Sequence, residues 1–321
     1  MKLLGQAETA DEFRAERALR SLLPANTDKI AYEAAALPVA SPSYQAVESI
    51  SFHVAPDGTD MTLFLRLGAA EVAELVDDQV AFAAARRAAS LGLAPELVGC
   101  DSAERALLVT RLGPGWKCAK IDDLIAPDAV ARLVVMQKTM AAGEAFGRVW
   151  TVFDGIAAIW SLLPKAGVPL PGDTDWMRGW MARMADSIRA AGVDHRPAHG
   201  DPHSSNIMLG PDGAMALVDF DMAGDIDPYY QLGVQMNELY QFESQMKLVL
   251  EMHDGRFDEA AFSRCRIYAA ADDFYWALRS LLLAARSQLQ GVEFLKYAAW
   301  RFLRCRMLLG QPGFEERLRT L

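Results

Sequence analysis

The sequence predicts an α+β fold of two lobes: a small N-terminal lobe built on an antiparallel sheet, and a larger, mostly helical C-terminal lobe. Three observations lead to this prediction. Strand-like alternation of β-branched residues is concentrated early in the chain, helical patterns rich in Ala, Met and Trp fill most of the remainder, and the segment Leu112–Trp116 (LGPGW) separates the two. We place the boundary there, with residues 1–112 in the N-terminal lobe and residues 113–321 in the C-terminal lobe.

The elements of the N-terminal lobe follow from residue spacing. Phe13, Leu19 and Leu22 lie on one face of a helix that Pro24 ends. A PDG turn joins the two strands of a hairpin. The expected elements are a helix over 11–23, strands over 44–54 and 60–68, a helix over 72–91, and strands at 96–99 and 105–110.

The C-terminal lobe is expected to be helical on both sides of one polar segment, residues 198–228. That segment carries two short strands, at 207–209 and 214–220, around a second PDG turn. Helices resume after it and continue to the C-terminus. The helices expected before it span 128–145, 151–163 and 175–192.

Composition and charge exclude several classes of protein. The 321 residues include 32 Lys and Arg against 42 Asp and Glu, a formal net charge of −10 without a basic block, so we expect no nucleic-acid partner. No apolar run approaches the roughly 18–20 residues that span a bilayer, and the acidic N-terminal region has no apolar signal segment. The four cysteines show no CxxC spacing. We therefore expect a cytoplasmic protein with reduced thiols and no membrane association.

The polar segment holds the candidate chemistry. His199, Asp201, Asn206, Asp219 and Asp221 form a dense set of polar side chains on loops beside the two short strands. Carboxylate and amide oxygens suit Mg²⁺, which takes one or two carboxylates and completes its shell with water and phosphate oxygens. A remaining carboxylate can accept a proton from an attacking hydroxyl. The alternative is that these are ordinary polar turn residues.

This segment resembles the aminoglycoside phosphotransferase and choline kinase families, and the rest of the chain is more similar to bacterial choline/ethanolamine kinase-like members. Residues 199–206 (HGDPHSSN) are similar to the H-x-D-x-x-x-x-N catalytic loop, and residues 218–221 (VDFD) to the metal-binding motif. The resemblance implies a protein kinase-like two-lobe fold that uses ATP and Mg²⁺. The roles it implies are catalytic base for Asp201, Mg²⁺ ligands for Asn206 and Asp219, and a brace of the loop for His199.

The N-terminal lobe departs from the family pattern. Where a Gly- or Ser-containing hairpin usually covers the ATP phosphates, this chain has Ser41 and Ser43 but no glycine. The strand position that often carries a phosphate-binding Lys is Arg66, which can bind phosphate bidentately or can be a solvated strand residue. We expect its helix partner to be Asp78 or Gln79.

For the acceptor we expect a small molecule with a hydroxyl group and a positive charge, of the choline, amino alcohol or aminoglycoside type. The candidate residues for holding it are Asp221, Asp225 and Trp276, since carboxylates and aromatic faces both attract cations. Core packing is the alternative explanation for the aromatic run around Trp276. His203 and His253 lack the ligand spacing of a zinc site and are expected to be ordinary loop histidines.

The leading hypothesis is an ATP- and Mg²⁺-dependent kinase, a transferase that moves the γ-phosphate to an alcohol group of its acceptor. A catalytically degenerate kinase-fold protein with a binding or regulatory role is an alternative, which the glycine-free stretch supports. A metal-dependent hydrolase fits less well, because the five histidines form no ligand cluster in the sequence.

Overall fold

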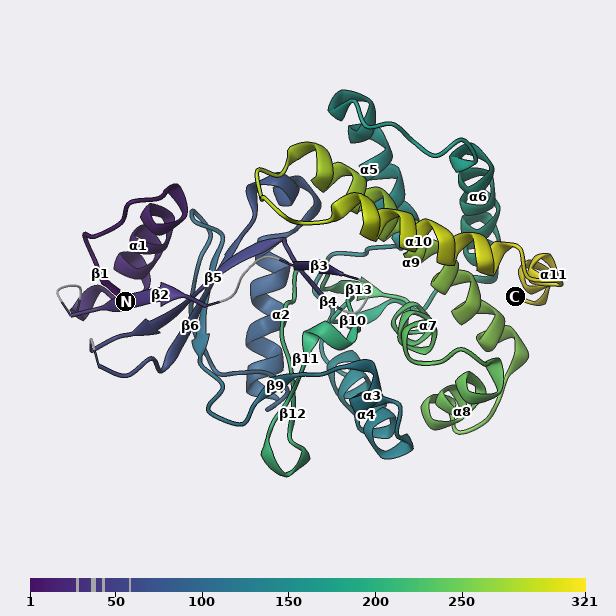
Figure 1. The fold of residues 1–321 in the computed structure, drawn as a ribbon. Helices are drawn as coiled ribbons and strands as arrows, with labels where there is room; N and C mark the ends of the chain where they lie inside the picture. Colours follow the sequence, from purple (N-terminus) through teal and green to yellow (C-terminus); the bar gives the residue numbers. More distant parts are fainter. Residues whose placement is uncertain (27–28, 36–38, 42–43, 58) are drawn as a thin grey trace.

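The computed structural model describes residues 1–26, 29–35, 39–41, 44–57 and 59–321. Figure 1 shows a smaller N-terminal lobe with a twisted sheet beside a larger lobe of helices. The predicted α+β architecture with an antiparallel sheet in its first lobe is therefore confirmed.

A six-stranded antiparallel sheet forms the N-terminal lobe, with the strand order β1-β2-β5-β6-β8-β7. Its strands are β1 (Lys2–Leu3), β2 (Ala31–Ala34), β5 (Ser49–Ala55), β6 (Leu63–Gly68), β7 (Leu97–Asp101) and β8 (Ala106–Thr110). Helix α1 (Ala10–Leu22) begins at a capping box, in which Thr9 and Glu12 each accept a hydrogen bond from the other's backbone N–H. Leu19 of α1 packs with Phe52 and Leu65 of the sheet in one buried core.

The helix predicted over 72–91 begins later than expected. The structure has a 3-10 segment, η2 (Ala70–Leu75), followed by α2 (Asp78–Ser90). The Asp77 carboxylate accepts hydrogen bonds from two backbone N–H groups in the first turn of α2 and so caps the helix. The prediction was wrong at this end because the apolar residues of η2 continue the helical spacing across the cap.

The single strand predicted over 44–54 is two strands. β4 (Tyr44–Ala46) pairs antiparallel with β3 (Val39–Ser41), apart from the main sheet. β3 contacts helix α10 (Phe294–Leu309), and β4 contacts the turn η3 (Ser204–Asn206). This hairpin therefore lies against the C-terminal lobe, beside the predicted catalytic loop. Ser43 lies outside the described residues, and only the backbone of Ser41 is described.

Helices make up most of the C-terminal lobe. Besides α10, its described helices are α3 (Ile121–Leu124), α4 (Pro127–Ala141), α5 (Val152–Ala166), α6 (Thr174–Ala191), α7 (Pro228–Leu239), α8 (Glu243–Asp254), α9 (Glu259–Arg286) and α11 (Phe314–Thr320). α9 is 28 residues long and packs against α5, α7, α10 and α11, so it is the central element of this lobe (Figure 1). The three helices predicted before the polar segment correspond to α4, α5 and α6.

Two small sheets carry the polar segment. β10 (Arg196–Ala198) pairs with β13 (Gly224–Ile226), and the order β12-β11-β9 joins β12 (Met215–Leu217), β11 (Ile207–Leu209) and β9 (Lys117–Cys118). β9 follows the LGPGW segment and pairs with β11, so the chain enters the C-terminal lobe directly after that segment.

The two lobes are joined by an apolar cluster and by a buried ion pair. In the cluster, Val47 and Val72 pack with Leu283 of α9. Arg279 of α9 has a relative exposure of 0 %, and its Nε donates a hydrogen bond of 2.6 Å to Glu48 Oε1. A buried guanidinium is strongly destabilising without a partner, so Glu48 connects the start of β5 to the centre of the C-terminal lobe.

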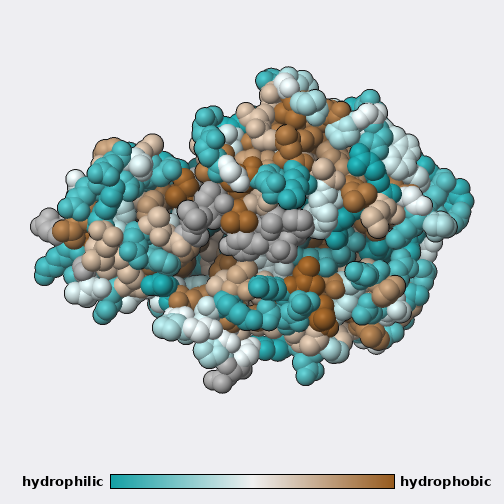
Figure 2. Space-filling view, viewed as in Figure 1, coloured by the Kyte–Doolittle hydropathy of each residue, from teal (hydrophilic) through white to brown (hydrophobic). Residues whose placement is uncertain are grey.

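The surface in the view of Figure 1 mixes hydrophilic and hydrophobic side chains over both lobes (Figure 2). α9 is the longest helix described, but Asp272, Asp273 and Arg279 interrupt its apolar sequence. Within the part of the chain that the structure describes, no helix has the length and apolar character needed to cross a membrane.

The close contact between α7 and α9 can be tested at Gly233. A Cβ atom on Gly233 would lie 2.2 Å from the carbonyl oxygen of Cys265, so Gly233→Ala must push the helices apart. We expect it to lower the free energy of unfolding by about 1–3 kcal/mol, measured by thermal and denaturant unfolding.

Gly179→Ala is the matched control, because Gly179 is an exposed glycine of α6 with no atom within 4 Å of its added Cβ. We expect this variant to be as stable as the wild type or up to about 1 kcal/mol more stable. Equal stability of the two variants would contradict the close α7–α9 contact.

Candidate active site

Strand pairing brings the two sequence motifs together. β11 follows Asn206 directly, and β12 is followed by Val218 and Asp219. The antiparallel register pairs Ile207 with Leu217, and the Val218 N–H donates to the Asn206 carbonyl at 3.0 Å. Asn206 and Asp219 therefore lie at the same end of one hairpin, although a turn separates them in the sequence.

His199 connects the predicted catalytic loop to the strand that leads to Asp219. Its Nδ1 accepts a hydrogen bond of 3.2 Å from the Asp201 backbone N–H, and its Nε2 lies 2.9 Å from the Val218 carbonyl oxygen. Because Nδ1 accepts, Nε2 must carry the proton and donate it. Burial lowers the pKa of His199, which favours this neutral ring.

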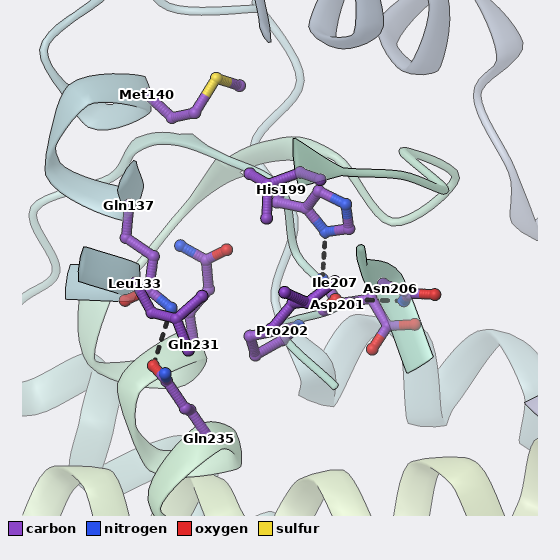
Figure 3. A pocket seen from close by; sticks show the side chains of 11 residues that line it. Leu133, Gln137, Met140, His199, Asp201, Pro202, Asn206, Ile207, Gln231 and Gln235 are labelled. Carbon is purple, nitrogen blue, oxygen red and sulfur yellow. Dashed lines mark hydrogen bonds between the residues drawn. The ribbon is translucent and has the colours of Figure 1, made fainter. Parts of the chain in front are cut away.

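The turn before Asp201 depends on Gly200. Its φ is +83°, and a Cβ there would lie 2.0 Å from the Met222 carbonyl oxygen, so only glycine fits. The Gly200 N–H donates to Gln231 Oε1 of α7 at 3.0 Å. Under this loop is a small cavity of about 20 Å³, which His199, Asn206, Gln231 and Gln235 help to line (Figure 3).

Asp201, the predicted base, is held as a carboxylate. Burial raises its pKa, but His203, His199 and Asn206 outweigh burial and bring the pKa to about 2. Its Oδ1 is in close contact with His203 Nδ1. For His203, burial and Arg301 lower the pKa, Asp201 and Glu238 raise it, and the net change is an increase. Asp201 is therefore ionised at neutral pH and is able to accept a proton.

Arg66 of β6 reaches from the N-terminal lobe to the predicted metal-binding motif. Its guanidinium binds Asp221 through two hydrogen bonds, 2.9 Å from Nη1 and 2.7 Å from Nη2. Nη2 also lies 2.9 Å from Asp219 Oδ1. The side chain of Arg66 is 13 % exposed, so it is not a solvated strand residue.

Asp219 has an unfavourable backbone conformation and lies close to other carboxylates. Its φ is +64°, in the left-handed region that residues other than glycine rarely adopt. Burial raises its pKa, Arg66 lowers it, and the neighbouring carboxylates Asp221 and Asp201 raise it further, with a net increase. A concentration of negative charge of this kind favours an additional cation.

The donor set fits Mg²⁺. Asn206 Nδ2 donates to the Asp201 carbonyl at 3.2 Å, which leaves the amide oxygen Oδ1 available as a ligand. Together with the Asp219 carboxylate this gives two hard oxygen donors, and Mg²⁺ commonly takes its remaining ligands from water and phosphate. No larger group of His, Cys, Asp and Glu side chains able to hold a metal occurs among the described residues.

The helix partner expected for Arg66 was wrong. Asp78 forms an ion pair with Arg105 instead, with Oδ2 at 2.7 Å from Arg105 Nε. Gln79 Nε2 donates to Ser102 at 2.8 Å. Arg66 obtains its negative partners from the C-terminal lobe, which the sequence could not indicate because they lie 155 and 153 positions away.

Of the three residues expected to hold the acceptor, Asp225 lies in a structural position. Its side chain is 4 % exposed, and its two carboxylate oxygens accept hydrogen bonds of 2.8 Å from the backbone N–H groups of Phe146 and Gly147. Asp221 is paired with Arg66. Neither carboxylate is free in this structure to face an acceptor.

Trp276, the third of these residues, belongs to the buried core of the C-terminal lobe. It is 7 % exposed, and the Arg279 guanidinium lies 5.3 Å from its ring centroid. The Arg301 guanidinium lies over Tyr297 in the same way, at 5.3 Å. These aromatic faces thus already contact cations of the protein itself.

Several site residues were missed by the sequence analysis. Glu238 of α7 accepts hydrogen bonds from the N–H and the hydroxyl of Ser204 in the catalytic loop, both at 2.8 Å. Gln231, Glu48 and Arg301 were also missed. For Glu48, the sequence contained an indirect signal in its partner Arg279, which precedes the apolar run Ser280–Leu283 (SLLL). A single charged residue within a buried helix requires a partner of opposite charge.

Comparison with known structures extends over nearly the whole chain. A choline/ethanolamine kinase family protein from Mesorhizobium loti is 22 % identical, with a TM-score of 0.74, 97 % of this chain covered and 98 % of the other. The choline kinase LicA from Streptococcus pneumoniae is 14 % identical, with a TM-score of 0.73 and coverages of 94 % and 99 %. The aminoglycoside phosphotransferase APH(2'')-IIIa, solved with GDP and kanamycin, is 13 % identical, with a TM-score of 0.64 and coverages of 92 % and 99 %.

These likenesses confirm the protein kinase-like fold. No curated protein sequence matches the chain. A model of the phosphotransferase enzyme family (APH) matches residues 48–268, which include the predicted catalytic loop and the metal-binding motif. The chain therefore belongs to the phosphotransferase enzyme family that its sequence motifs resemble.

Proposed function

We propose that this protein is an ATP- and Mg²⁺-dependent kinase that transfers the γ-phosphoryl group of ATP to a hydroxyl group of a small cationic molecule. One observation carries the proposal: Arg66 of the N-terminal lobe binds Asp219 beside the loop of Asp201 and Asn206. A base, two oxygen donors for a metal and a phosphate-binding guanidinium are the parts that phosphoryl transfer requires.

In the proposed reaction, Asp201 accepts the proton of the acceptor hydroxyl while the hydroxyl oxygen bonds to the γ-phosphorus and the bond to ADP breaks. His199 and Gln231 hold the backbone on either side of Gly200, so they keep the base in place. Asn206 and Asp219 would hold Mg²⁺, which when bound neutralises charge on the phosphates. Arg66 supplies guanidinium donors to the phosphates from the opposite lobe.

Several observations support a nucleotide donor and a cationic acceptor. Related structures contain AMP or GDP, so a nucleotide donor is expected. The net charge of −10 attracts cations through a field that salt screens over about 8–10 Å. At the site itself, the three carboxylates of Asp201, Asp219 and Asp221 carry more negative charge than the single guanidinium of Arg66 offsets. The names of the related proteins, choline and ethanolamine kinases, agree with an acceptor of this charge.

The proposal is tested by measuring ADP release from ATP, with and without Mg²⁺, across choline, ethanolamine, kanamycin and the neutral alcohol glycerol. We expect Mg²⁺-dependent release with a cationic alcohol and none with glycerol. If ATP raises the melting temperature but no acceptor in a broad panel of alcohols yields ADP, the degenerate binding protein becomes the better explanation.

Asp201→Asn should abolish most turnover while leaving ATP·Mg²⁺ affinity within a few-fold of the wild type. The amide cannot accept the proton, and the loss of a general base costs about 10²–10⁴ in kcat. Asp194→Asn is the control, because that side chain is 75 % exposed and bonds only locally, to Arg196. Turnover of Asp201→Asn near the wild-type rate would reject the assignment of the base.

Asp219→Ala should weaken nucleotide binding selectively when Mg²⁺ is present. Removal of the carboxylate takes away a direct metal ligand, whereas nucleotide binding without Mg²⁺ does not use it. Isothermal titration of ATP at several Mg²⁺ concentrations measures the effect, with Asp186→Ala, 74 % exposed, as the control. Unchanged affinity at every Mg²⁺ concentration would show that Asp219 is not a ligand.

Trp276→Ala should destabilise the protein by about 3–5 kcal/mol, because the ring is buried against Arg279 and forms an edge contact with His203 at 5.9 Å. We expect kcat to fall without a selective rise in the KM of the acceptor. Trp176→Ala, at a position 48 % exposed, should change little. A selective rise in acceptor KM at an unchanged melting temperature would instead place Trp276 at the acceptor.

A further inference from the structure

His203 lies between the proposed base and the paired helices α9 and α10. Its Nδ1 contacts Asp201 Oδ1 on one side. On the other side its Nε2 lies 2.8 Å from Nη2 of Arg301, a residue of α10. The histidine is 8 % exposed, so both of its ring nitrogens are committed to protein partners.

The chemistry of Arg301 decides which ring nitrogen of His203 carries the proton. A guanidinium has only donors and keeps its charge in proteins, so Nε2 must accept. The nearest carboxylate oxygen to Nε2, Oδ2 of Asp272, is 3.8 Å away, beyond hydrogen-bond distance. A doubly protonated ring would turn an N–H toward the guanidinium. Asp201 and Glu238 favour the charged ring, but the donor of Arg301 at 2.8 Å requires an unprotonated Nε2, which leaves the ring proton on Nδ1.

Arg301 is itself fixed from several directions. Its Nη1 lies 2.9 Å from Asp273 Oδ1, and its Nε and Nη2 donate to the Tyr297 hydroxyl at 3.0 and 2.8 Å. The side chain is 5 % exposed. Since the guanidinium cannot rotate without losing these bonds, it presents the same donor to His203 in a constant direction.

We propose that His203 and Arg301 are positioning residues for Asp201: Arg301 fixes the tautomer of His203, and the Nδ1–H of His203 then holds Oδ1 of Asp201. This inference rests on the proposed function of Asp201 as the base. With one carboxylate oxygen held by the imidazole, the other oxygen is kept in a single orientation for the acceptor hydroxyl. Misplacement of a reacting group by about 1 Å can cost about 100-fold in rate.

Two substitutions of His203 distinguish its contact with Asp201 from its contact with Arg301. In His203→Asn, the amide N–H occupies the place of Nδ1 and can still donate to Asp201. In His203→Gln, the amide oxygen can reach the place of Nε2 and accept from Arg301, but Asp201 loses its donor. We expect His203→Asn to keep kcat within about tenfold of the wild type, and His203→Gln to lose about 100-fold, with similar KM values for ATP in both.

His253→Asn is the matched control, because His253 Nδ1 contacts Asp254 Oδ1 at 2.6 Å in a His–Asp pair outside the catalytic loop. It should leave kcat and KM unchanged. If His203→Gln keeps as much kcat as His203→Asn in an active protein, the positioning role is wrong. If the wild type itself releases no ADP in the acceptor panel, the proposed function fails instead.

Nuclear magnetic resonance tests the tautomer without any turnover. In ¹⁵N-histidine-labelled protein, long-range ¹H–¹⁵N correlation distinguishes protonated from unprotonated ring nitrogens, and His203→Gln identifies the signal by its loss. We expect a protonated Nδ1 and an unprotonated Nε2 for His203. A proton on Nε2, alone or together with Nδ1, would overturn the role given to Arg301.

Discussion

The burial of many carboxylates close together is the constraint on which this structure depends. An ionised carboxylate in the interior is destabilising by several kcal/mol unless a partner offsets the loss of water. Each of these groups has such a partner, drawn mainly from arginines. The pairs are Arg66 with Asp219 and Asp221, Arg279 with Glu48, Arg301 with Asp272 and Asp273, and His203 with Asp201.

The same pairs set the relation between the lobes. Arg66 of β6 and Glu48, directly before β5, belong to the first lobe, whereas their partners Asp221 and Arg279 belong to the second. A change in lobe orientation would therefore separate buried charges, in addition to exposing the apolar cluster around Val72 and Leu283. In the proposed reaction, the contacts that stabilise the interface would thus also hold the nucleotide next to the acceptor, as phosphoryl transfer requires.

Charge pairing also limits how an acceptor can be recognised. A cation can be bound by aromatic faces or by carboxylates, but here the face of Trp276 is next to Arg279 and that of Tyr297 is next to Arg301. Asp225 is used by two backbone amides. If the acceptor is a cation, as proposed, the surplus of negative charge around Asp201 and Asp219 is the feature that would favour it over an anion.

The sequence by itself determined the two lobes, most of the helices before the polar segment, and the loop and hairpin on which the predicted site residues lie. These features follow from the spacing of residues close together in the sequence. Apolar residues repeat every two positions in strands and every 3.6 positions in helices, and Asp201, Asn206 and Asp219 stand at fixed intervals within one short segment. The structure placed the start of α2 at the local Asp77 cap. Tertiary structure alone decided that Arg66 pairs with Asp221 and not with Asp78, and that Asp225 supports a backbone turn. These last two contacts depend on partners far along the chain, and the energy of a charge pair is set by distance and burial in space, which the order of residues does not encode.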